Sequence, residues 1–594
     1  MSGNLTLLPG FPLPTLQHLG ASQPTDVDAK AVAAEWLGKF AAAAEASDAE
    51  GVAKLFMSEC YWRDMLALTW DFRTFTGIDN IRTFLVDRLP ISQLKSFKIR
   101  DEYLSLQQPF PDLVWIMFLF DFEADGSWKA NTILTNLEDL QGFPERIGAN
   151  RSTEANHGLW ASQRQAEMTF KDKEPTALVI GGGQGGLEIA ARLKVLDIST
   201  LIVEKNSRIG DNWRNRYQAL CLHDPVYADH LPYMPFPANW PVYAPSAKLA
   251  NWLEFYAETM ELNVWLSSEV TKATQNADNT WAVTVRFSDG KERHFKSVNH
   301  IIFAAGIAGG DVNMPTYPGT EKFKGEIIHS AQYKTPAPHI GKKVVVVGAC
   351  TSAHDIASDY HLHGVDVTMY QRSSTYVMST KSGWDVFFAG LYAENALPTE
   401  IADRVNASLP NSFLYHGFVQ RAVGYVAQLD KALLDGLHER GFRTNMGIDG
   451  TGFTMLAFQK AAGYYLDVGA SQMIIDGKIK LKNDSLLQKF TETGLKFEDG
   501  SEVPADVVVY ATGYGDARGI IRKICGEEVA SKCSQVWGMN AEGELQGTFK
   551  DMRVPGLWYC LGNLSLDRFH SKHLALQIKA IEEKKFGTRY SLRA

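Results

Sequence analysis

The stretch Thr176–Leu193 reads TALVIGGGQGGLEIAARL, and it decides the fold of the region around it. A short apolar run leads into Gly181, Gly183 and Gly186 and then into an amphipathic helix pattern, while the following STLIVEK is typical of a second strand. Because these glycines have no side chains, the turn can bend sharply and approach a pyrophosphate. The free N–H groups at the start of the helix then bind that pyrophosphate. Glu204 ends the second strand 18 residues after Gly186, which suits ribose hydroxyls. The stretch therefore predicts a Rossmann-like dinucleotide site.

The pattern of strand, turn, helix and strand recurs at Lys342–Ser374, KKVVVVGACTSAHDIASDYHLHGVDVTMYQRSS. Gly348 keeps the first glycine of the turn, but Cys350 and Ala353 replace the second and the third. Alanine is tolerated at the last position, whereas the Cys350 side chain is expected to crowd a pyrophosphate. The second turn therefore predicts a dinucleotide site that departs from the usual pattern, and a weak or repurposed site is the alternative.

Three further residues indicate which nucleotide the second site takes. Thr351 and Ser352 stand at the helix start, where hydroxyl groups cap the helix and bond phosphate oxygens. Arg372 follows the second strand, where a cation binds the 2′-phosphate of NADPH, and no acidic residue occupies that place. The pattern favours NADPH over NADH.

The predicted fold class is α/β, with two Rossmann-like dinucleotide-binding domains preceded by a small α+β domain. A helical, aromatic-rich insertion at about 384–464 is expected to cover the active site. The predicted boundaries are an extended tail at 1–30, the α+β domain at 31–147, a linker at 148–174, the first dinucleotide-binding domain at 175–335 and again at 506–594, and the second at 336–505.

Composition excludes several classes of function. Lys and Arg number 59 against 68 Asp and Glu, a net charge of −9, without a basic block that follows a phosphate backbone, so nucleic acid is not expected as a partner. The longest apolar run, Val114–Phe120, is far shorter than the roughly 20 residues that span a bilayer, and no signal peptide is recognised. A cytoplasmic protein without a transmembrane segment is expected. The six cysteines form no C-x-x-C pair, which fits a reducing compartment.

No metal site is predicted. The two histidine pairs of the sequence lack a matching cysteine or carboxylate cluster, so they are expected at the surface or at helix caps. These pairs are His361 with His363, and His570 with His573.

The segment GDNWRNRYQALCLHDP at 210–225 resembles flavin-containing monooxygenases, including the plant YUCCA enzymes, in which a G-x-x-W segment packs along the flavin. The resemblance implies that the first site holds FAD. It assigns to this cofactor Gly210, Asn212, Trp213 and Arg214, together with Gln184 of the turn and Lys205 beside Glu204.

His223 stands where many relatives have an asparagine near the reactive face of the flavin, and YUCCA-like members also have histidine there. The resemblance therefore implies that His223 and Asp224 lie beside the flavin and take part in catalysis. The alternative is a histidine that only satisfies backbone groups next to the cofactor.

FKGEIIHSAQY matches the FxGxxxHxxxY identifier of this flavoprotein class through Phe323, Gly325, His329 and Tyr333. His329 is a catalytic candidate, with a structural role coupling the two domains as the alternative, and Tyr333 is a cofactor-binding candidate. Baeyer–Villiger relatives usually end the motif with tryptophan, so Tyr333 favours a flavin-containing monooxygenase.

Two late elements complete the resemblance. Thr512, Gly513 and Tyr514 belong to an ATGY element that links the domains back to the flavin, and Gly562 with Asn563 forms a late turn beside it. A helix from about Lys572 is expected to direct its N-terminal N–H groups at the flavin ring.

The resemblance implies an FAD-dependent, NADPH-consuming monooxygenase that uses a flavin C4a-hydroperoxide to insert one oxygen atom of O2 into a small molecule. The aromatic residues of the insertion favour an apolar or aromatic substrate, for example an indolic acid by analogy. The alternatives are a Baeyer–Villiger enzyme, an uncoupled NADPH oxidase, and a binding or scaffold protein with a vestigial flavin fold.

The α+β domain resembles NTF2-like or SnoaL-like domains through AAEWLGKF, LFMSECYWRDMLALTW and FTGIDNIRTFL. Trp62, Arg63 and Asp64 are its pocket candidates, although a buried carboxylate beside an arginine is commonly a satisfied pair. An interface or substrate-shaping role is preferred, and a homodimer through this domain is a further expectation.

Overall fold

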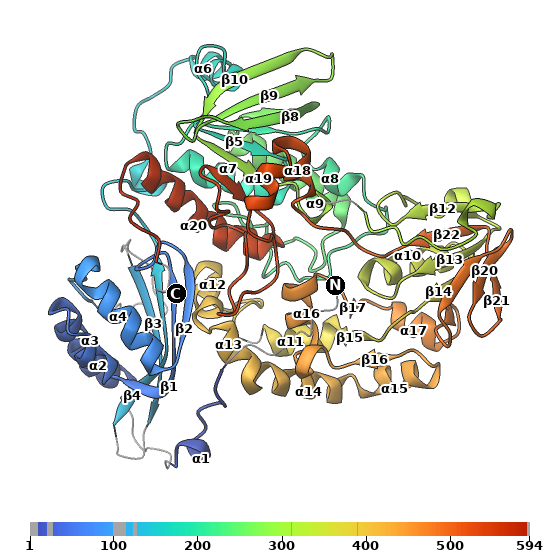
Figure 1. Cartoon of the computed structure of the whole chain (residues 1–594), viewed down its shortest axis with the longest axis horizontal. Coiled ribbons are helices and arrows are strands. Elements are labelled where there is room, and N and C mark those ends of the chain that lie inside the picture. The colour runs from blue at the N-terminus through green and yellow to red at the C-terminus, as the bar shows by residue number, and fades with distance from the viewer. Residues whose placement is uncertain are drawn as a thin grey trace.

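The computed structural model describes residues 10–20, 28–98, 114–122, 127–309, 312–388 and 390–590. Figure 1 shows the N-terminal domain beside the helix α20, the two dinucleotide-binding domains at the top and the right, and a mostly helical layer below. Within these ranges, the structure contains no helix with the length and apolar character needed to cross a bilayer.

The N-terminal domain is a four-stranded sheet with helices against one of its faces (Figure 1). The strand order is β2-β1-β4-β3, with β1 parallel to β4 and the other pairs antiparallel. Trp36 and Phe40 of α2 stack at 5.1 Å in the core between the helices and the sheet. The elements are α1 Leu16–Leu19, α2 Ala29–Glu45, α3 Ala49–Ala53, β1 Phe56–Met65, β2 Phe72–Thr76, α4 Ile78–Ser92, β3 Val114–Phe122 and β4 Trp128–Leu137. Its likeness to NTF2-like domains stays a prediction.

The first dinucleotide-binding domain is built on the parallel sheet β23-β11-β5-β6-β7. The strands β5, β6, β11 and β23 are buried along their whole length and mostly apolar, as expected for a parallel sheet covered on both faces, and α20 packs against α7. The sheet and its helices are β5 Ala177–Ile180, α7 Gln184–Val195, β6 Thr200–Val203, α8 Asp211–Arg214, α9 Ser246–Thr259, β7 Val264–Trp265, β11 His300–Phe303, β23 Leu557–Tyr559 and α20 Leu564–Glu582. Attached to it are α6 Trp160–Thr169, the antiparallel strands β8 Ser268–Gln275, β9 Trp281–Phe287 and β10 Glu292–Val298, and the helices α18 Gly519–Cys525 and α19 Glu527–Lys532.

The second dinucleotide-binding domain repeats this arrangement in the parallel sheet β12-β22-β13-β14-β18. Its elements are β12 Glu326–His329, β13 Lys343–Val347, α10 Thr351–Leu362, β14 Asp366–Tyr370, β18 Lys480–Lys482 and β22 Val507–Tyr510, with the hairpins β19 Leu487–Phe490, β20 Gly494–Phe497 and β21 Glu502–Pro504. The predicted boundaries at 335 and 506 place β12 and β22 in the first domain, which is wrong. Both strands belong to the second sheet because β22 pairs with β13 and with β12.

The insertion extends from Thr375 to Asp467. It is mostly helical and contains the small parallel sheet β16-β15-β17 (Figure 1). Its strands are β15 Thr375–Ser379, β16 Thr444–Asn445 and β17 Tyr464–Asp467. Its helices are α11 Thr380–Phe387, α12 Thr399–Ser408, α13 Asn411–Phe413, α14 Val419–Leu429, α15 Lys431–Glu439 and α16 Gly452–Lys460, and α17 Ala470–Ile475 follows it.

The two glycine turns hold the neighbouring strand of each sheet in the same way. Gly181 has a φ of +111°, and a Cβ there would lie 2.6 Å from the carbonyl oxygen of Ala304, just after β11. Gly348 has a φ of +134°, and its Cβ would lie 2.5 Å from the carbonyl oxygen of Ala511, just after β22. Any side chain would clash with backbone at these distances, so only glycine permits the approach.

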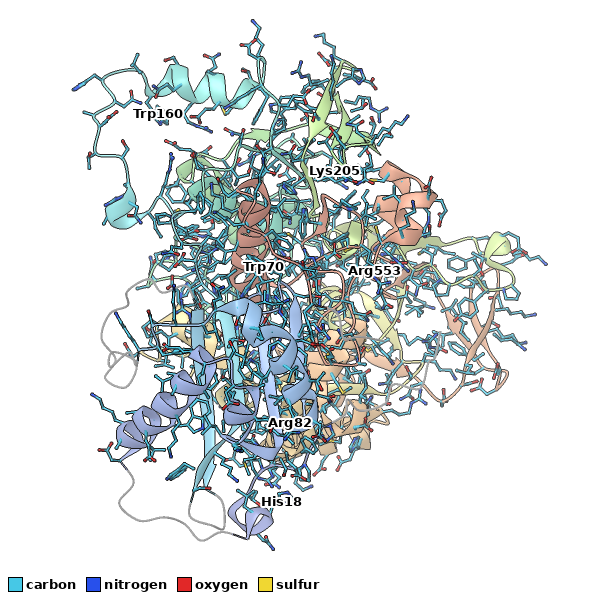
Figure 2. The ribbon with its side chains drawn as sticks, turned by 60° about the vertical axis from the view of Figure 1, so that its left-hand side comes forward. His18, Trp70, Arg82, Trp160, Lys205 and Arg553 are labelled. Atoms are coloured by element: carbon cyan, nitrogen blue, oxygen red, sulfur yellow. The ribbon has the colours of Figure 1, made fainter. Side chains whose placement is uncertain are left out.

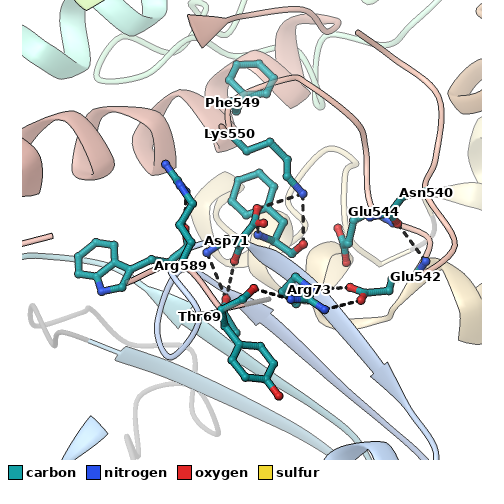
Figure 3. Close-up of polar contacts among 12 residues, drawn as sticks. Thr69, Asp71, Arg73, Asn540, Glu542, Glu544, Phe549, Lys550 and Arg589 are labelled. Carbon is teal, nitrogen blue, oxygen red and sulfur yellow. Dashed lines mark hydrogen bonds and ion pairs between the residues drawn. The ribbon is translucent and has the colours of Figure 1, made fainter. Parts of the chain in front are cut away.

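The open face of the N-terminal sheet is covered by the rest of the chain. Arg63 Nε and Nη2 donate to both carboxylate oxygens of Glu544 at 2.8 Å. Arg73 binds Glu542 in the same bidentate way, and Lys550 lies 3.1 Å from Asp71 (Figure 3). Such paired N–H donors favour one geometry over others, so these contacts orient the domain.

The chain terminus adds a further contact to this junction. Trp70 lies between the N-terminal domain and α20 in Figure 2, with its ring 4.6 Å from that of Phe586, and Arg589 donates to its carbonyl oxygen. The N-terminal domain is therefore docked on the first dinucleotide-binding domain within one chain. A homodimer through this domain stays a prediction, and it would use the helical face because the sheet face is occupied.

The predicted pocket candidates of this domain point to opposite faces of β1, because side chains alternate along a strand. Trp62 and Asp64 are buried in the domain core, where the Asp64 carboxylate accepts from the hydroxyl groups of Thr69 and Thr135. Arg63 leaves on the other face toward Glu544. The expected pairing of Asp64 with Arg63 is therefore wrong.

Replacing Arg63 with methionine is expected to lower the free energy of unfolding by about 3 kcal/mol, because Glu544 stays buried without its cation. Denaturant unfolding of the purified chain measures this. The control Arg82→Met removes the half-exposed pair of Arg82 with Glu50 and should cost less than about 1 kcal/mol. Equal effects of the two substitutions would contradict the docking role of Arg63.

Candidate active site

One cavity of about 1540 Å³ lies where the first dinucleotide-binding domain, the insertion and the N-terminal domain meet. Eleven of the predicted site residues line it, from four separate parts of the chain. These are Gly181, Gly183, Gln184, Glu204, Lys205, Asn212, Trp213, Asp224, Tyr514, Gly562 and Asn563. The structure therefore brings together the first turn, the segment after it, the ATGY element and the late turn.

The first turn has the shape that a pyrophosphate needs. A Cβ at Gly186 would lie 2.0 Å from the carbonyl oxygen of Gly181, so the helix start packs directly on the turn. The carboxylate of Glu204 accepts hydrogen bonds from the backbone N–H groups of Gly182 at 2.6 Å and Asn206 at 2.8 Å. Glu204 keeps free lone pairs, and it faces the cavity, where ribose hydroxyls would donate to it. The residues present fit an FAD molecule.

Gln184 connects three segments around the turn. Its side chain accepts from Trp213 Nε1 at 3.3 Å and donates to the carbonyl oxygen of Gly562 at 3.5 Å. Asn563 continues the chain of contacts, because its Nδ2 donates to Asp224 Oδ2 at 3.3 Å while its Oδ1 caps α20 through the N–H of Leu566. The late helix thus begins at Leu564, earlier than the predicted Lys572, because Asn563 is the cap.

Three predicted cofactor ligands form the framework instead of the cavity wall. Gly210 has a φ of +86°, and its Cβ would lie 2.3 Å from the carbonyl oxygen of Ala250 on α9. Arg214 binds Asp211, Asn251 and Glu254 and does not line the cavity, and its contact with the cofactor stays a prediction. Gly186 acts through the packing of the turn described above.

His223 is a contact between the two dinucleotide-binding domains. Its Nδ1 lies 2.8 Å from the carbonyl oxygen of Leu466 and its Nε2 lies 3.2 Å from Asp355 Oδ1 on α10. Both partners are acceptors, so a protonated ring satisfies both at once. Burial alone lowers the pKa of His223, but hydrogen bonding and the charge of Asp355 outweigh it and the net pKa is raised. His223 does not line the cavity, whereas its neighbour Asp224 does.

His329 and Tyr333 are buried away from the cavity. His329 Nε2 bonds the carbonyl oxygen of Gly513 at 3.1 Å, and its Nδ1 accepts from the N–H of Ala331. Both ring nitrogens are occupied by backbone, which favours the structural role that couples the domains, and a catalytic role of His329 stays a prediction. The hydroxyl of Tyr333 donates to Asp359 of α10 at 2.7 Å, and its contact with a cofactor stays a prediction.

The second turn lies outside this cavity. Its Gly348, Thr351 and Ser352 do not line it, nor do Arg372, Thr512 and Gly513. The Cys350 Sγ accepts a hydrogen bond from the N–H of Gly463 at 3.3 Å, and the Thr351 hydroxyl lies 3.5 Å from the carbonyl oxygen of Tyr464. The Cys350 side chain therefore contacts the insertion and ties it to the turn.

Two buried acids at the cavity had no signal in the sequence. Asp229 and Asp567 line it, each with an oxygen that lacks a hydrogen-bond partner among the described residues. Burial raises the pKa of Asp567 well above its usual range, and burial together with the charge of Asp567 does the same for Glu188 of α7. The carboxyl groups of Glu188 and Asp567 thus lie together under the first turn, brought there by the packing of α20 on α7.

The histidines of α20 were predicted at the surface or at helix caps, and this is wrong. They are buried because the N-terminal domain covers that helix. His573 Nε2 bonds Asn136 of β4 at 2.6 Å, and His570 contacts the ring of Phe72 at 5.2 Å. Within the described ranges, no group of three or more acids, cysteines and histidines is arranged to hold a metal ion.

The model of the flavin-binding monooxygenase-like family aligns with residues 179–523, a range that includes both glycine turns. The chain belongs to this family. It is therefore an oxidoreductase, and the predicted flavin-containing monooxygenase class and its flavin cofactor are confirmed.

Individual relatives in this family share little more than a quarter of their residues with this chain. Indole-3-pyruvate monooxygenase YUCCA1 of Oryza sativa subsp. japonica is 27% identical over 343 residues, which is 57% of this chain and 77% of the relative. Probable indole-3-pyruvate monooxygenase YUCCA8 of Arabidopsis thaliana is 28% identical over 341 residues, with 57% and 74% covered. A cyclohexanone monooxygenase structure aligns with a TM-score of 0.51 at 18% identity, over 69% of this chain and 88% of that one, which shows the shared fold.

His223→Gln is expected to change how stability depends on pH. Because the folded-state pKa is raised, the His223 contact contributes fully below the unfolded value of about 6.5 and is lost as pH rises through the folded pKa. Denaturant unfolding should show the wild-type chain losing stability over this rise and the variant lacking that loss, with a deficit at low pH of about 3 kcal/mol.

The control for this measurement is His294→Gln, which removes an exposed contact with Glu292 and should keep the wild-type dependence on pH. If His223→Gln and the wild-type chain respond identically to pH, His223 is not the charged partner of Asp355.

Proposed function

We propose that the chain is an FAD-dependent, NADPH-consuming monooxygenase that inserts one oxygen atom of O2 into an apolar or aromatic small molecule. The observation that carries this proposal is the single cavity that runs from the first glycine turn to the aromatic residues of the insertion. FAD bound at the turn would supply hydride acceptance and oxygen activation, and the relatives YUCCA1 and YUCCA8 are named as monooxygenases.

The insertion shapes the apolar part of the cavity. Its aromatic side chains bury large apolar areas and exclude water, which protects reactive species and strengthens electrostatic interactions inside. Nine of them line the wall: Trp384, Phe387, Phe388, Tyr392, Tyr415, Phe418, Phe453, Phe458 and Tyr464. Substrate binding by stacking and dispersion follows from such a wall, which is the support for an apolar or aromatic substrate.

Around the first turn, the chain's own groups bind and orient the cofactor. The N–H groups at the start of α7 bind the pyrophosphate, and Glu204 accepts from the ribose. Asn563 and Asp224 hold each other at the opposite side of the turn, so both present fixed polar atoms to the cavity. The start of α20 at Leu564 adds further N–H donors beside them.

Support for NADPH comes from the end of β14. Arg372 is exposed there, and the guanidinium of Arg443 donates to its carbonyl oxygen at 2.9 Å. Two cations at this strand end favour the 2′-phosphate that distinguishes NADPH from NADH.

The structure bears on two of the alternatives, the Baeyer–Villiger enzyme and the scaffold protein. Tyr333 does not contact the cavity, so it gives no ground in the structure for ranking oxygen transfer to a heteroatom or carbon above Baeyer–Villiger insertion. The scaffold alternative loses its support, because the chain belongs to an enzyme family and keeps the complete first turn.

The test is NADPH consumption by the purified chain under ¹⁸O₂, with indoles, thioethers, amines and ketones as candidate substrates and mass spectrometry of the products. One labelled oxygen atom in a product is expected, and its position distinguishes ester formation from other oxygenation. Hydrogen peroxide as the sole product with every candidate would replace the proposal by an NADPH oxidase.

Arg372→Ala should raise the KM for NADPH about tenfold and leave the KM for NADH nearly unchanged, since it removes a charge-assisted contact with the 2′-phosphate worth roughly 1.5 kcal/mol. Steady-state kinetics with both nucleotides measures this. Arg421→Ala, an exposed arginine of α14, is the control and should alter neither value. A parallel rise for NADPH and NADH would remove Arg372 from the 2′-phosphate site.

A further inference from the structure

Two polar side chains stand where the part of the cavity around the first turn meets the part beside the aromatic insertion. Asp224 lines the wall on the side of the first turn, where Asn563 Nδ2 donates to its Oδ2 at 3.3 Å. Tyr464 lines the wall on the side of the insertion, where its ring lies 6.0 Å from the ring of Phe453. Both residues are half-buried, so both reach the open cavity.

The strand β17 directs Tyr464 into the cavity. Side chains alternate along a strand, so Tyr464 and Leu466 line the cavity while Tyr465 between them is buried in the core of the second dinucleotide-binding domain. His223 Nδ1 lies 2.8 Å from the carbonyl oxygen of Leu466, which holds β17 against the segment that carries Asp224. Asp224 and Tyr464 therefore face the same part of the cavity.

The second glycine turn fixes the start of this strand. Cys350 Sγ accepts a hydrogen bond from the N–H of Gly463 at 3.3 Å, and the Thr351 hydroxyl lies 3.5 Å from the carbonyl oxygen of Tyr464. On the other side, the N–H of Tyr376 on β15 donates to the carbonyl oxygen of Gly463 at 3.0 Å. The unusual cysteine of the second turn thus helps to hold the Tyr464 backbone in place.

Both polar side chains have free hydrogen-bonding capacity. Among the described residues, the Tyr464 hydroxyl has no hydrogen-bond partner, and Asp224 uses only its Oδ2. Unlike the unpaired oxygens of Asp229 and Asp567, the Tyr464 hydroxyl and Asp224 Oδ1 are not closed off from solvent. Burial raises the pKa of Tyr464 and the negative charge of Asp224 adds to this, so the hydroxyl stays protonated and interacts with the carboxylate across the cavity. A ligand in the cavity can reach both groups.

Among the described residues, the aromatic part of the cavity has no free cation. The insertion contributes neither a lysine nor an arginine to the described wall, and the N-terminal domain contributes Arg63, which Glu544 neutralises at 2.8 Å. The other lysines and arginines of the wall belong to the dinucleotide-binding domains: Lys205, Arg216, Lys334, Arg522 and Lys523.

Asp224 adds a negative charge beside this aromatic part. Burial raises its pKa, but the hydrogen bond from Asn563 and the positive charge of His223 lower it and favour the carboxylate form. The ring of His223 is already bound to Asp355 and Leu466, so it offers no contact to a ligand. A carboxylate substrate would meet a like charge here and no compensating cation, which is costly in an apolar environment.

We propose that Asp224 and Tyr464 select an uncharged aromatic substrate that carries a hydroxyl group and exclude the matching carboxylate. The free Oδ1 of Asp224 accepts a hydrogen bond from a hydroxyl group, the Tyr464 hydroxyl donates to its oxygen, and the aromatic ring packs on the insertion wall beside Phe453. Tyr464 is thereby a specificity-determining residue of the cavity. This inference rests on the proposed oxygenase function, because it names the substrate class of the same cavity.

Three probes of similar size are compared by calorimetric titration of the purified, flavin-loaded chain: phenethyl alcohol, ethylbenzene, which lacks the hydroxyl group, and phenylacetate, in which a carboxylate replaces the hydroxymethyl group. Phenethyl alcohol is expected to bind about tenfold more tightly than ethylbenzene, as for two hydrogen bonds, and phenylacetate is expected to bind weakest. Equal binding of phenethyl alcohol and ethylbenzene, tightest binding of phenylacetate, or no measurable binding of phenethyl alcohol overturns the inference.

Tyr464→Phe removes the hydroxyl group, keeps the ring and breaks no hydrogen bond within the described part of the chain. It is expected to weaken phenethyl alcohol binding about fivefold, as for one hydrogen bond, and to leave the ethylbenzene dissociation constant unchanged. Tyr425→Phe, at an exposed tyrosine of α14 outside the cavity, is the matched control and should change neither constant. Unchanged binding of phenethyl alcohol in Tyr464→Phe contradicts the role of this residue and overturns the inference.

Asp224→Asn removes the negative charge and keeps an oxygen that accepts from Asn563. This substitution is expected to improve phenylacetate binding about fivefold, because the like charge beside the ligand is lost, and to narrow the preference for phenethyl alcohol. Phenylacetate binding that stays as weak as in the wild-type chain would show that Asp224 does not exclude carboxylates, which also overturns the inference.

The two proposals fail in different ways. If NADPH reduces the bound flavin of the wild-type chain but the probes show no preference for the hydroxyl group, the substrate inference is wrong and the oxygenase proposal stands. If NADPH does not reduce the flavin while the probe preferences hold, the site exists and the proposed reaction is wrong.

Discussion

The contact on which the structure depends is the approach of two backbones at each glycine turn. At Gly181 and Gly348 the turn passes so close to the carbonyl oxygen of the neighbouring strand end that a Cβ would overlap it. This approach exposes the N–H groups of α7 and α10 at the edge of a buried parallel sheet, where a dinucleotide binds. Fold and cofactor site therefore follow from the same constraint, applied twice in one chain.

Around this framework the cavity is assembled from distant segments. The insertion brings aromatic side chains, and it is tied to the second turn through the contact of Gly463 with Cys350. The N-terminal domain contributes the remaining wall, held by bidentate contacts of Arg63 and Arg73 with Glu544 and Glu542. The shape of this cavity therefore depends on each of the interfaces between the three parts of the chain.

Sequence reasoning recovered what depends on local pattern. The strand, turn and helix units, the glycines and Glu204 could be recognised because short-range sterics demand these residue types. It could not find the contacts that depend on long-range packing: Arg214, His329 and Tyr333 bind Glu254, Gly513 and Asp359, which lie far from them in the sequence. No local signal marks Asp355 as the partner of His223, or β22 as a strand of the second sheet, because both arise from segments far apart in sequence.

The most direct test of the account is an anaerobic titration of the purified chain with NADPH, monitored through the visible absorption of bound flavin. The account predicts a preparation that holds about one FAD per chain and loses its flavin absorption on addition of one equivalent of NADPH. A chain that binds no FAD when reconstituted, or whose bound FAD stays oxidised in excess NADPH, would contradict it.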